Sequence, residues 1–274
     1  AEPFLPMHNI AFIGAGRMAT DSVKGILTKN AAMVNAITCF SASGTSAVIL
    51  AQATGIKTAS DLPELLKDAD LVIVAFKPQH LATADSRLAA LTTDKIVLSV
   101  LAAKTLEHLH AVFPQARNII RTMPNTPSAI GAGITGWCAR ENLTSADREN
   151  VIGVLDSIGR EMEVPEGKID ALMGVSGCGP AFLFEFTGAL RDAGIAAGLS
   201  TDEAAELAVE TVLGSARYMA RSNCTPEELR DEVTSPNGTT FAGLQVLKSA
   251  NFRDTMKDVV TAAKARSVEL ANGG

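Results

Sequence analysis

Aromatic and charged residues are scarce in this sequence of 274 residues. Phenylalanine, tryptophan and tyrosine together make up 4%, and charged residues make up 20%. Hydrophobic residues reach 47%. This balance excludes a highly charged disordered chain and predicts a folded protein with a sizeable core. The length suits two modest domains or one large domain.

An excess of basic residues is also missing. The chain has 24 lysines and arginines against 30 acidic residues, which gives a net charge of −6. Without a basic stripe to meet phosphates, a nucleic-acid partner is not expected. A small-molecule substrate, even an acidic one, remains compatible with this charge because it needs only local hydrogen-bond donors.

Cysteine pairs, membrane-spanning runs and targeting signals are absent from the sequence pattern. The four cysteines are scattered and form no CxxC motif, which predicts reduced thiols and a cytoplasmic protein. No apolar run reaches the ~18 residues that span a bilayer, so no membrane partner is expected. No charged segment followed by an apolar run marks a secretory signal. Residues 1–6, which precede Met7, are interpreted as an extension.

Metal and hydrolase motifs are not found either. The four histidines form no HExxH, and no cluster of cysteine and histidine has zinc spacing, so no metal site is predicted. The segment Gly174–Cys178 departs from the GxSxG nucleophile motif at its last position, and no expected strand leads into it. A hydrolase is therefore not predicted.

The first part of the chain alternates expected strands with expected helices. The near-continuous apolar runs Asp70–Ala75 and Lys95–Val100 are typical of parallel strands buried on both faces. Further strands are expected over 8–13, 36–40 and 118–121, and helices over 17–29 and 45–53. This alternation predicts an α/β fold, a doubly wound Rossmann domain with a mostly parallel sheet.

The pattern changes near Val164–Gly167, and every later element is predicted to be helical. Helices are expected over 180–198, 201–221, from 226 onward, 240–249 and 253–271. The first of them is apolar on most faces, so we expect it to be buried. The predicted domains are therefore an NAD(P)-binding Rossmann domain over 1–165 and an all-helical domain over 166–274.

A glycine-rich turn follows the first expected strand. Gly14–Ala19 reads GAGRMA, the GxGxxA form of the dinucleotide fingerprint. Gly14 permits the tight turn, Gly16 lets the backbone approach a pyrophosphate, and the helix offers free N–H groups. A plain glycine turn is the alternative, but the position between a strand and a helix favours a cofactor site. The candidate cofactor-binding residues here are Ile13, Gly14, Ala15, Gly16, Arg17 and Met18.

The end of the second strand bears on the choice between NADP and NAD. The segment Cys39–Ser46 contains four hydroxyl side chains and no acidic residue, so nothing in it repels a 2′-phosphate. It also lacks arginine. We expect NADPH to be preferred, with NADH as a second donor, and Ser41 to contact the cofactor. A loop that only caps the next helix is compatible with the same residues.

A second cofactor segment is expected after the strand over 70–75. Ligands of doubly wound sheets bind in the crevice at the carboxyl ends of the strands. The candidate residues in this turn are Ala75, Phe76, Lys77 and Pro78. Lys77 either faces the cofactor or is an ordinary solvated lysine ahead of a helix.

The segment Thr234–Thr240, TSPNGTT, lies between two expected helices. Pro236 fixes one turn residue, and Gly238 is expected to adopt a positive φ. The following helix begins with exposed N–H groups, which suit a carboxylate. The alternative is a capped turn between helices that binds nothing.

Five segments resemble motifs of the pyrroline-5-carboxylate reductase family, in the family's order and spacing. They are GAGRMA at Gly14–Ala19, the turn Ala75–Pro78, RTMPNTP at Arg121–Pro127, GVSGCGPAF at Gly174–Phe182 and Pro226–Lys248. The resemblance covers nearly the whole chain from Met7. The chain departs from it in having Cys178 and Phe182 for Ser and Tyr, Asn237 for Gly, and Leu101–Lys104 for an AAG turn.

The resemblance implies the reduction of 1-pyrroline-5-carboxylate to L-proline, the last step of proline biosynthesis, with hydride from NAD(P)H. It implies that Asn125 lies near the nicotinamide, that Ser235 meets the substrate carboxylate and that Thr240 acts at the ring nitrogen. The substrate-binding residues it implies are Ser235, Asn237, Gly238, Thr239 and Thr240. It also implies interlocked dimers that join into larger rings, and the many apolar helices favour a homo-oligomer too.

Three other functions stay open at this point. One is the reduction of another imine. A second is a relative of the β-hydroxyacid dehydrogenases, which would need a catalytic lysine in the helical domain, where the helix over 180–198 offers Arg191 but no lysine. The third is a non-catalytic regulatory protein that binds NAD(P).

Overall fold

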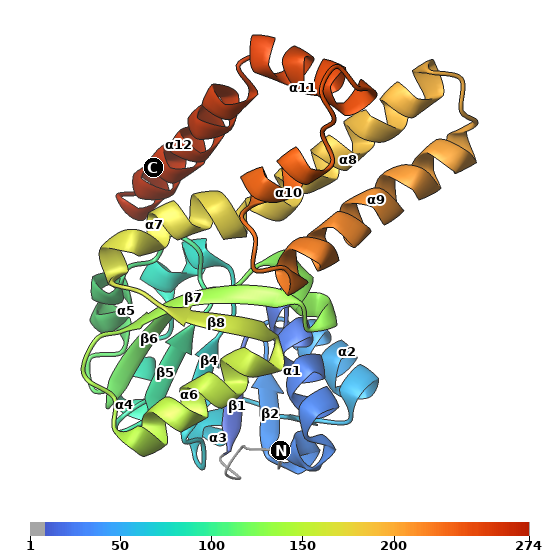
Figure 1. The fold of residues 1–274 in the computed structure, drawn as a ribbon. Coiled ribbons are helices and arrows are strands. Elements are labelled where there is room, and N and C mark those ends of the chain that lie inside the picture. The colour runs from blue at the N-terminus through green and yellow to red at the C-terminus, as the bar shows by residue number, and fades with distance from the viewer. Residues whose placement is uncertain (1–8, 274) are drawn as a thin grey trace. The chain divides into compact units, whose positions relative to one another are not determined.

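A computed structural model describes residues 9–273, so His8 and the extension over 1–6 lie outside the described part (Figure 1). The chain divides into two compact units. One contains the residues up to Gly177 together with those from Ala263 onward, and the other is Cys178–Ala262.

The first unit is built on a sheet of eight strands in the order β3-β2-β1-β4-β5-β6-β7-β8. All neighbouring strands are parallel except β6 and β7, which confirms the predicted doubly wound, mostly parallel sheet. The strands are β1 (Ile10–Ile13), β2 (Ile37–Phe40), β3 (Lys57–Thr58), β4 (Leu71–Val74), β5 (Ile96–Ser99), β6 (Asn118–Met123), β7 (Gly133–Ala139) and β8 (Gly159–Glu163).

Helices cover both faces of this sheet, and so the central strands read as continuous apolar runs. Every residue of β1, β4 and β5 is buried. One core lies under α1 (Arg17–Lys29), α2 (Thr45–Thr54) and α6 (Ser145–Ser157). The other lies under α3 (Leu62–Leu66), α4 (Leu88–Leu91), α5 (Leu106–Val112) and α7 (Ile169–Leu172).

Short helical turns complete the connections. They are the 3-10 turns η1 (Ala31–Asn35), η2 (Pro78–Thr83), η3 (Thr126–Ile130) and η4 (Glu166–Lys168), and the π-helical turn η5 (Met173–Gly177).

The sequence pattern did not reveal β7, β8 and α6. β7 contains two glycines, and β8 (GREME) carries three charged residues at the edge of the sheet. Neither strand has the apolar pattern by which a buried strand is found. Their place in the sheet depends on pairing with distant residues.

The second unit is helical, as predicted. It contains α8 (Gly179–Ala196), α9 (Thr201–Arg221), α10 (Pro226–Glu232), α11 (Thr239–Ser249) and the first half of α12 (Phe252–Ala271). Capping boxes define two of the helix starts. Ser200 pairs with Glu203 before α9, and Thr225 pairs with Glu228 before α10.

The expectation that the first long helix is buried was wrong for the single chain. None of the residues of α8 is buried, and Phe184 is 62% exposed. Leu183, Phe186 and Leu190 are exposed as well. A unit of this size cannot cover an all-round apolar helix with its own few neighbours. An exposed apolar surface of this kind marks an interaction site.

One helical stretch among the described residues is long and apolar, although Glu185 interrupts it and no uninterrupted apolar run reaches ~18 residues. The continuous helical stretch Glu166–Ala196 has 31 residues, and its length and composition are sufficient to cross a membrane. One such helix is weak evidence, because the core helix of a soluble protein meets the same criteria.

Candidate functional site

The glycine-rich turn after β1 touches the turn after β4. Gly14 has φ of 104°, and a Cβ at this position would lie 2.6 Å from the carbonyl carbon of Ala75 and the nitrogen of Phe76. Only glycine fits there, both for its backbone angle and for its contact. Two of the predicted cofactor segments, Ile13–Met18 and Ala75–Pro78, are therefore neighbours at the same edge of the sheet.

The start of α1 is open and uncapped. Gly16 is the N-cap residue. Within residues 9–273 no side chain caps the helix, and apart from its chain neighbours and the helix backbone no atom lies within 4 Å of the Cβ position of Gly16. Ala19 is fully buried against the core, whereas Arg17 is exposed. Free backbone N–H groups beside open space fit the pyrophosphate of a dinucleotide. The residues present thus suit NAD(P)H.

Ser41, directly after β2, already has a structural role. It is 9% exposed, and its Oγ accepts a hydrogen bond of 3.1 Å from the backbone N–H of Ala47 in the first turn of α2. The hydroxyl proton of Ser41 remains available to a ligand. The exposed Ser43 and Thr45 add further donors at this end of β2.

The turn after β4 contains one cation. Ala75 and Phe76 are half-buried, and Lys77 is exposed as the N-cap residue of η2, which begins at Pro78. Lys77 follows the peptide that Gly14 contacts. The sequence alternatives for Lys77, a cofactor contact or a solvated lysine, both fit this position.

Both polar atoms of the Asn125 side chain form hydrogen bonds. Its Oδ1 accepts a 3.0 Å hydrogen bond from the N–H of Ile134, and its Nδ2 donates a 3.1 Å hydrogen bond to the carbonyl oxygen of Ser176. Asn125 therefore ties the turn after β6 to the start of β7 and to the π-helical turn Met173–Gly177. No residue pattern predicted this bridge, since π-helical turns have no simple sequence signature. Such turns are frequent at functional sites.

The strand register aligns these turns. Ile13 pairs with Val74, Val74 pairs with Ser99, and Ser99 pairs with Arg121. The turns after β1, β4 and β5 each leave the sheet directly after this row, and β6 ends two residues later. Ligands bind at this carboxyl edge in open α/β sheets. All the candidate cofactor residues lie along it or at its neighbour β2.

The predicted substrate loop lies in the helical unit and has a different backbone from the expected one. Asn237, not Gly238, has the positive φ, at 59°, and Gly238 has φ of −80° and ψ of 179°. Apart from glycine, Asn is one of the residues that best tolerate this backbone conformation. Gly238 is needed for space, because a Cβ there would overlap the Oγ of Ser235.

The loop leads into an uncapped helix start. Gly238 is the N-cap residue of α11, no side chain caps this helix, and Thr239 and Thr240 are its first two residues. Both threonines and Ser235 are exposed. The turn is closed by a 3.0 Å hydrogen bond from the N–H of Gly238 to the carbonyl oxygen of Ser235. Free N–H groups with three nearby hydroxyls are suited to a carboxylate.

Comparison with known proteins adds two family matches. A family model described as pyrroline-5-carboxylate reductase dimerisation matches residues 166–270. A model described as NADP oxidoreductase, coenzyme F420-dependent, matches residues 9–103.

Curated relatives match over the full length. The pyrroline-5-carboxylate reductase of Arabidopsis thaliana is 36% identical, with 96% of this chain and 95% of the relative covered. The enzyme of the same name from Pseudomonas aeruginosa is 35% identical, with 96% of each covered.

Solved structures agree with these matches. A pyrroline-5-carboxylate reductase from Coxiella burnetii superimposes with a TM-score of 0.91 at 32% identity, covering 97% of this chain and 99% of that one. The Plasmodium falciparum pyrroline carboxylate reductase, solved with NADP bound, has a TM-score of 0.85 at 27% identity, with 96% and 98% covered.

Proposed function

The chain belongs to the pyrroline-5-carboxylate reductase family, and from this membership we propose the residues that carry out its reaction. The enzyme reduces the C=N bond of 1-pyrroline-5-carboxylate to give L-proline, with NAD(P)H as the hydride donor. Full-length similarity to these reductases favours this reaction over another imine reductase, a β-hydroxyacid dehydrogenase or a non-catalytic NAD(P)-binding regulator.

We assign dinucleotide binding to the turns at the carboxyl edge of the sheet. The N–H groups at the start of α1 hold the pyrophosphate beside Gly16, where no side chain intrudes. The proposed cofactor-binding residues also include Ser41 at the ribose phosphate, Ala75–Pro78 beside Gly14, and the backbone at Asn125. NADPH is the preferred donor because no acidic side chain stands at the end of β2 to repel the 2′-phosphate.

The substrate carboxylate binds at the start of α11. The backbone N–H groups of Thr239 and Thr240 point out of the first turn, and the positive end of the helix dipole favours an anion there. The hydroxyl of Ser235 is exposed at the same turn. Asn237 and Gly238 serve by their backbone, which sets the shape of the loop.

Thr240 hydrogen-bonds the ring nitrogen of the bound substrate. That nitrogen is one bond from the carbon that carries the carboxylate, so a hydroxyl beside the carboxylate site can reach it. The imine is basic, and the hydroxyl or a water supplies or stabilises its proton. The rest of catalysis is alignment of the two reactants, which is worth at best about 7–11 kcal/mol.

The protein forms a homo-oligomer through its helical domain. We propose that the unit is a dimer and that dimers join into larger rings. The exposed apolar side chains of α8 support this assembly, as does an open groove of about 800 Å³ lined in part by Phe241, Leu244 and Phe252. A second copy would cover these surfaces.

We assign residues 1–165 to dinucleotide binding and 166–274 to substrate binding and dimerisation. A cytoplasmic location is supported by the four cysteines, which are all free within the described residues.

The observation that carries the site assignment is the uncapped start of α11 behind the Ser235–Gly238 turn. The experiment is NADPH oxidation, followed at 340 nm, when purified enzyme receives pyrroline-5-carboxylate, with L-proline quantified as the product. A simple ketone or a different cyclic imine without a carboxylate serves as the control substrate. Turnover of the control at an equal rate would contradict a carboxylate site.

A further inference from the structure

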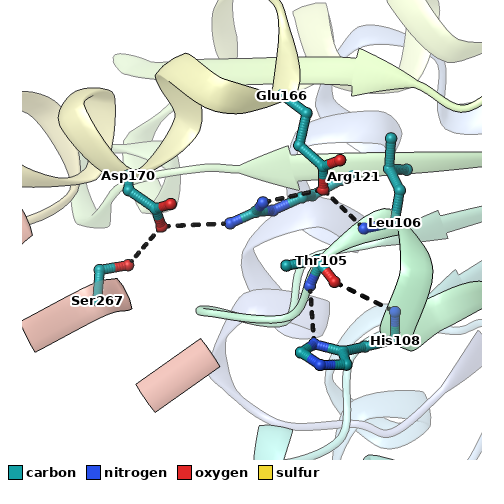
Figure 2. A network of polar contacts seen from close by, with 7 residues as sticks. All are labelled: Thr105, Leu106, His108, Arg121, Glu166, Asp170 and Ser267. Carbon is teal, nitrogen blue, oxygen red and sulfur yellow. Dashed lines mark hydrogen bonds and ion pairs between the residues drawn. The ribbon is translucent and has the colours of Figure 1, made fainter. Parts of the chain in front are cut away.

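A buried arginine stands directly beneath the carboxyl edge of the sheet. Arg121, in β6, is 3% exposed (Figure 2). Its Nη1 lies 3.1 Å from Oε1 of Glu166, and its Nη2 lies 3.5 Å from Oδ1 of Asp170. A buried guanidinium needs such partners, because an unpaired buried charge is costly.

The two carboxylates also hold other segments. Oε1 of Glu166 accepts a 2.7 Å hydrogen bond from the N–H of Leu106, the first residue of α5. Oδ1 of Asp170 accepts a 2.7 Å hydrogen bond from the hydroxyl of Ser267 in α12. Ser267 is 1% exposed. Figure 2 shows Arg121 between the two carboxylates, with Leu106 on the far side of Glu166 and Ser267 on the far side of Asp170.

The segment held by Glu166 is the loop from β5 to α5. Ala103 in this loop has φ of 57°, a backbone conformation that L residues other than Asn and Asp rarely adopt. A capping box of Thr105 and His108 fixes the end of the loop (Figure 2). A strained conformation persists only where its surroundings over-determine it. The hydrogen bond that the N–H of Leu106 donates to Glu166 holds the loop three residues beyond Ala103.

A second tie joins the same parts of the chain. Asn125, four residues beyond Arg121, donates to the carbonyl oxygen of Ser176. Two side chains thus attach this part of the chain to the segment 166–177. Arg121 of the strand pairs with Glu166 near the start of that segment, and Asn125 of the turn bonds to Ser176 near its end. Arg121 and Asn125 together leave this turn little freedom.

We propose that Arg121 is a positioning residue for hydride transfer. By holding Glu166, which accepts from the N–H of Leu106, it fixes the loop after β5, and by holding the segment 166–177, which accepts from Asn125, it helps to fix the turn after β6. Asn125 is the residue proposed to lie near the nicotinamide. Arg121 itself touches neither reactant. This inference rests on the proposed cofactor site, because it needs the nicotinamide to meet these turns.

The matched test uses two arginines of the same region, Arg121 within β6 and Arg117 directly before it. Arg117 pairs with Asp147 at 2.8 Å and so is also held by a carboxylate. Arg117→Lys and Arg121→Lys make the same chemical change at the two positions. We measure kcat per folded enzyme, the Kd for NADPH, and the primary deuterium isotope effect with 4-deuterated NADPH.

Arg121→Lys is expected to lower kcat by about 10-fold to 100-fold, since a misplacement of about 1 Å costs this much. The Kd for NADPH should change by less than about threefold, because the pyrophosphate contacts stay in place. The isotope effect on kcat should rise as hydride transfer becomes rate-limiting. Arg121→Met should be slower still, so that lysine rescues part of the rate.

Two results would overturn the proposal. One is a kcat for Arg121→Lys equal to that of Arg117→Lys, with only the melting temperature lowered. The other uses no turnover: the fluorescence of the nicotinamide of bound NADPH should change in Arg121→Lys and not in Arg117→Lys, so an unchanged signal contradicts the role. Failure of the proposed function is distinguishable, because the wild-type enzyme would then lack turnover in the first place.

Discussion

The Oγ of Ser235 occupies the space that a side chain on Gly238 would need. The two residues are also joined by the hydrogen bond from the N–H of Gly238 to the carbonyl oxygen of Ser235. The shape of the proposed carboxylate site therefore depends on the absence of a Cβ at residue 238.

Gly238→Ala is expected to raise KM for pyrroline-5-carboxylate, because the new methyl group displaces Ser235 from the loop. The Kd for NADPH should stay at the wild-type value. Ser235→Ala removes the overlapping atom, so the double variant should have nearly the same KM as Ser235→Ala alone. Steady-state kinetics on the three variants checks this, and additive effects would contradict the steric explanation.

A negative charge at the end of β2 should weaken NADPH selectively. In Ser41→Asp the carboxylate can still accept from the N–H of Ala47, so this hydrogen bond to the first turn of α2 is kept. Its charge repels the 2′-phosphate and should raise the Kd for NADPH by about tenfold, the effect of roughly 1.4 kcal/mol. NADH, which lacks this phosphate, is the control ligand. An equal loss of affinity for both cofactors would instead indicate a damaged loop.

Ala103 stands in the turn where the family has AAG, and its positive φ explains why glycine suits this place. The left-handed conformation costs an alanine about 1–2 kcal/mol. Glycine avoids this cost, but its greater freedom in the unfolded chain lowers the free energy of unfolding by about 0.5–1 kcal/mol. Ala103→Gly should therefore raise the free energy of unfolding by about 0.5–1 kcal/mol in urea titrations. The neighbouring Ala102→Gly is the control and should lower it.

Two buried thiols predict a dependence on alkaline pH. Burial raises the pKa of Cys39 and of Cys138 to about 11 from an ordinary value of 9.0. Between pH 9 and about pH 11, both thiols stay protonated in the folded state, whereas they ionise in the unfolded chain. Their contribution to stability is complete below pH 9 and is lost as the pH rises towards 11. Urea titrations across this range check the fall.

Alkylation at neutral pH gives the matching chemical test. Iodoacetamide should modify the exposed Cys224 in the native protein and reach Cys39 and Cys138 only after unfolding, because the thiolate is the reactive form. Peptide mapping by mass spectrometry distinguishes the sites. Rapid native labelling of either buried cysteine would contradict the raised pKa.

Local patterns predicted the parts of the structure that depend on local physics. The GAGRMA turn was located because a strand, two glycines and a helix must follow one another within a few residues. The start of α10 is a similarly short motif, Thr225 followed by Pro226 and two acidic residues, whereas the capping box of Ser200 and Glu203 before α9 was not predicted.

Other features depend on partners far along the chain, and local patterns missed them. β8 is an edge strand that pairs only with β7 among the residues that the structure describes, and its charged residues conceal it from the apolar pattern of a buried strand. Arg121 is buried because Glu166 and Asp170, more than forty residues away, pair with it. An arginine inside the apolar run NIIRTM was the one available sign of a buried ion pair. The exposure of α8 was missed because its apolar faces suit a second copy and not its own unit.

Thr240 is expected to act in catalysis and not in helix capping. Gly238 is the N-cap residue of α11, and no side chain caps this helix, so Thr240 has no capping bond to lose. Thr240→Ala should fold with a melting temperature near that of the wild type and bind NADPH normally. Loss of a hydrogen bond to a charged group costs about 1.5–3 kcal/mol, which lowers kcat/KM by roughly ten- to a hundred-fold.

Ser235→Ala should behave differently from Thr240→Ala. The carboxylate contact is alike in the ground state and the transition state, so its loss raises KM more than it lowers kcat. Thr255→Ala is the control for Thr240→Ala, because Thr255 is another exposed helical threonine, whose hydroxyl bonds only to the carbonyl oxygen of Asn251. If Thr240→Ala instead matched Thr255→Ala in kcat/KM, the hydroxyl of Thr240 would have no part in reducing the imine.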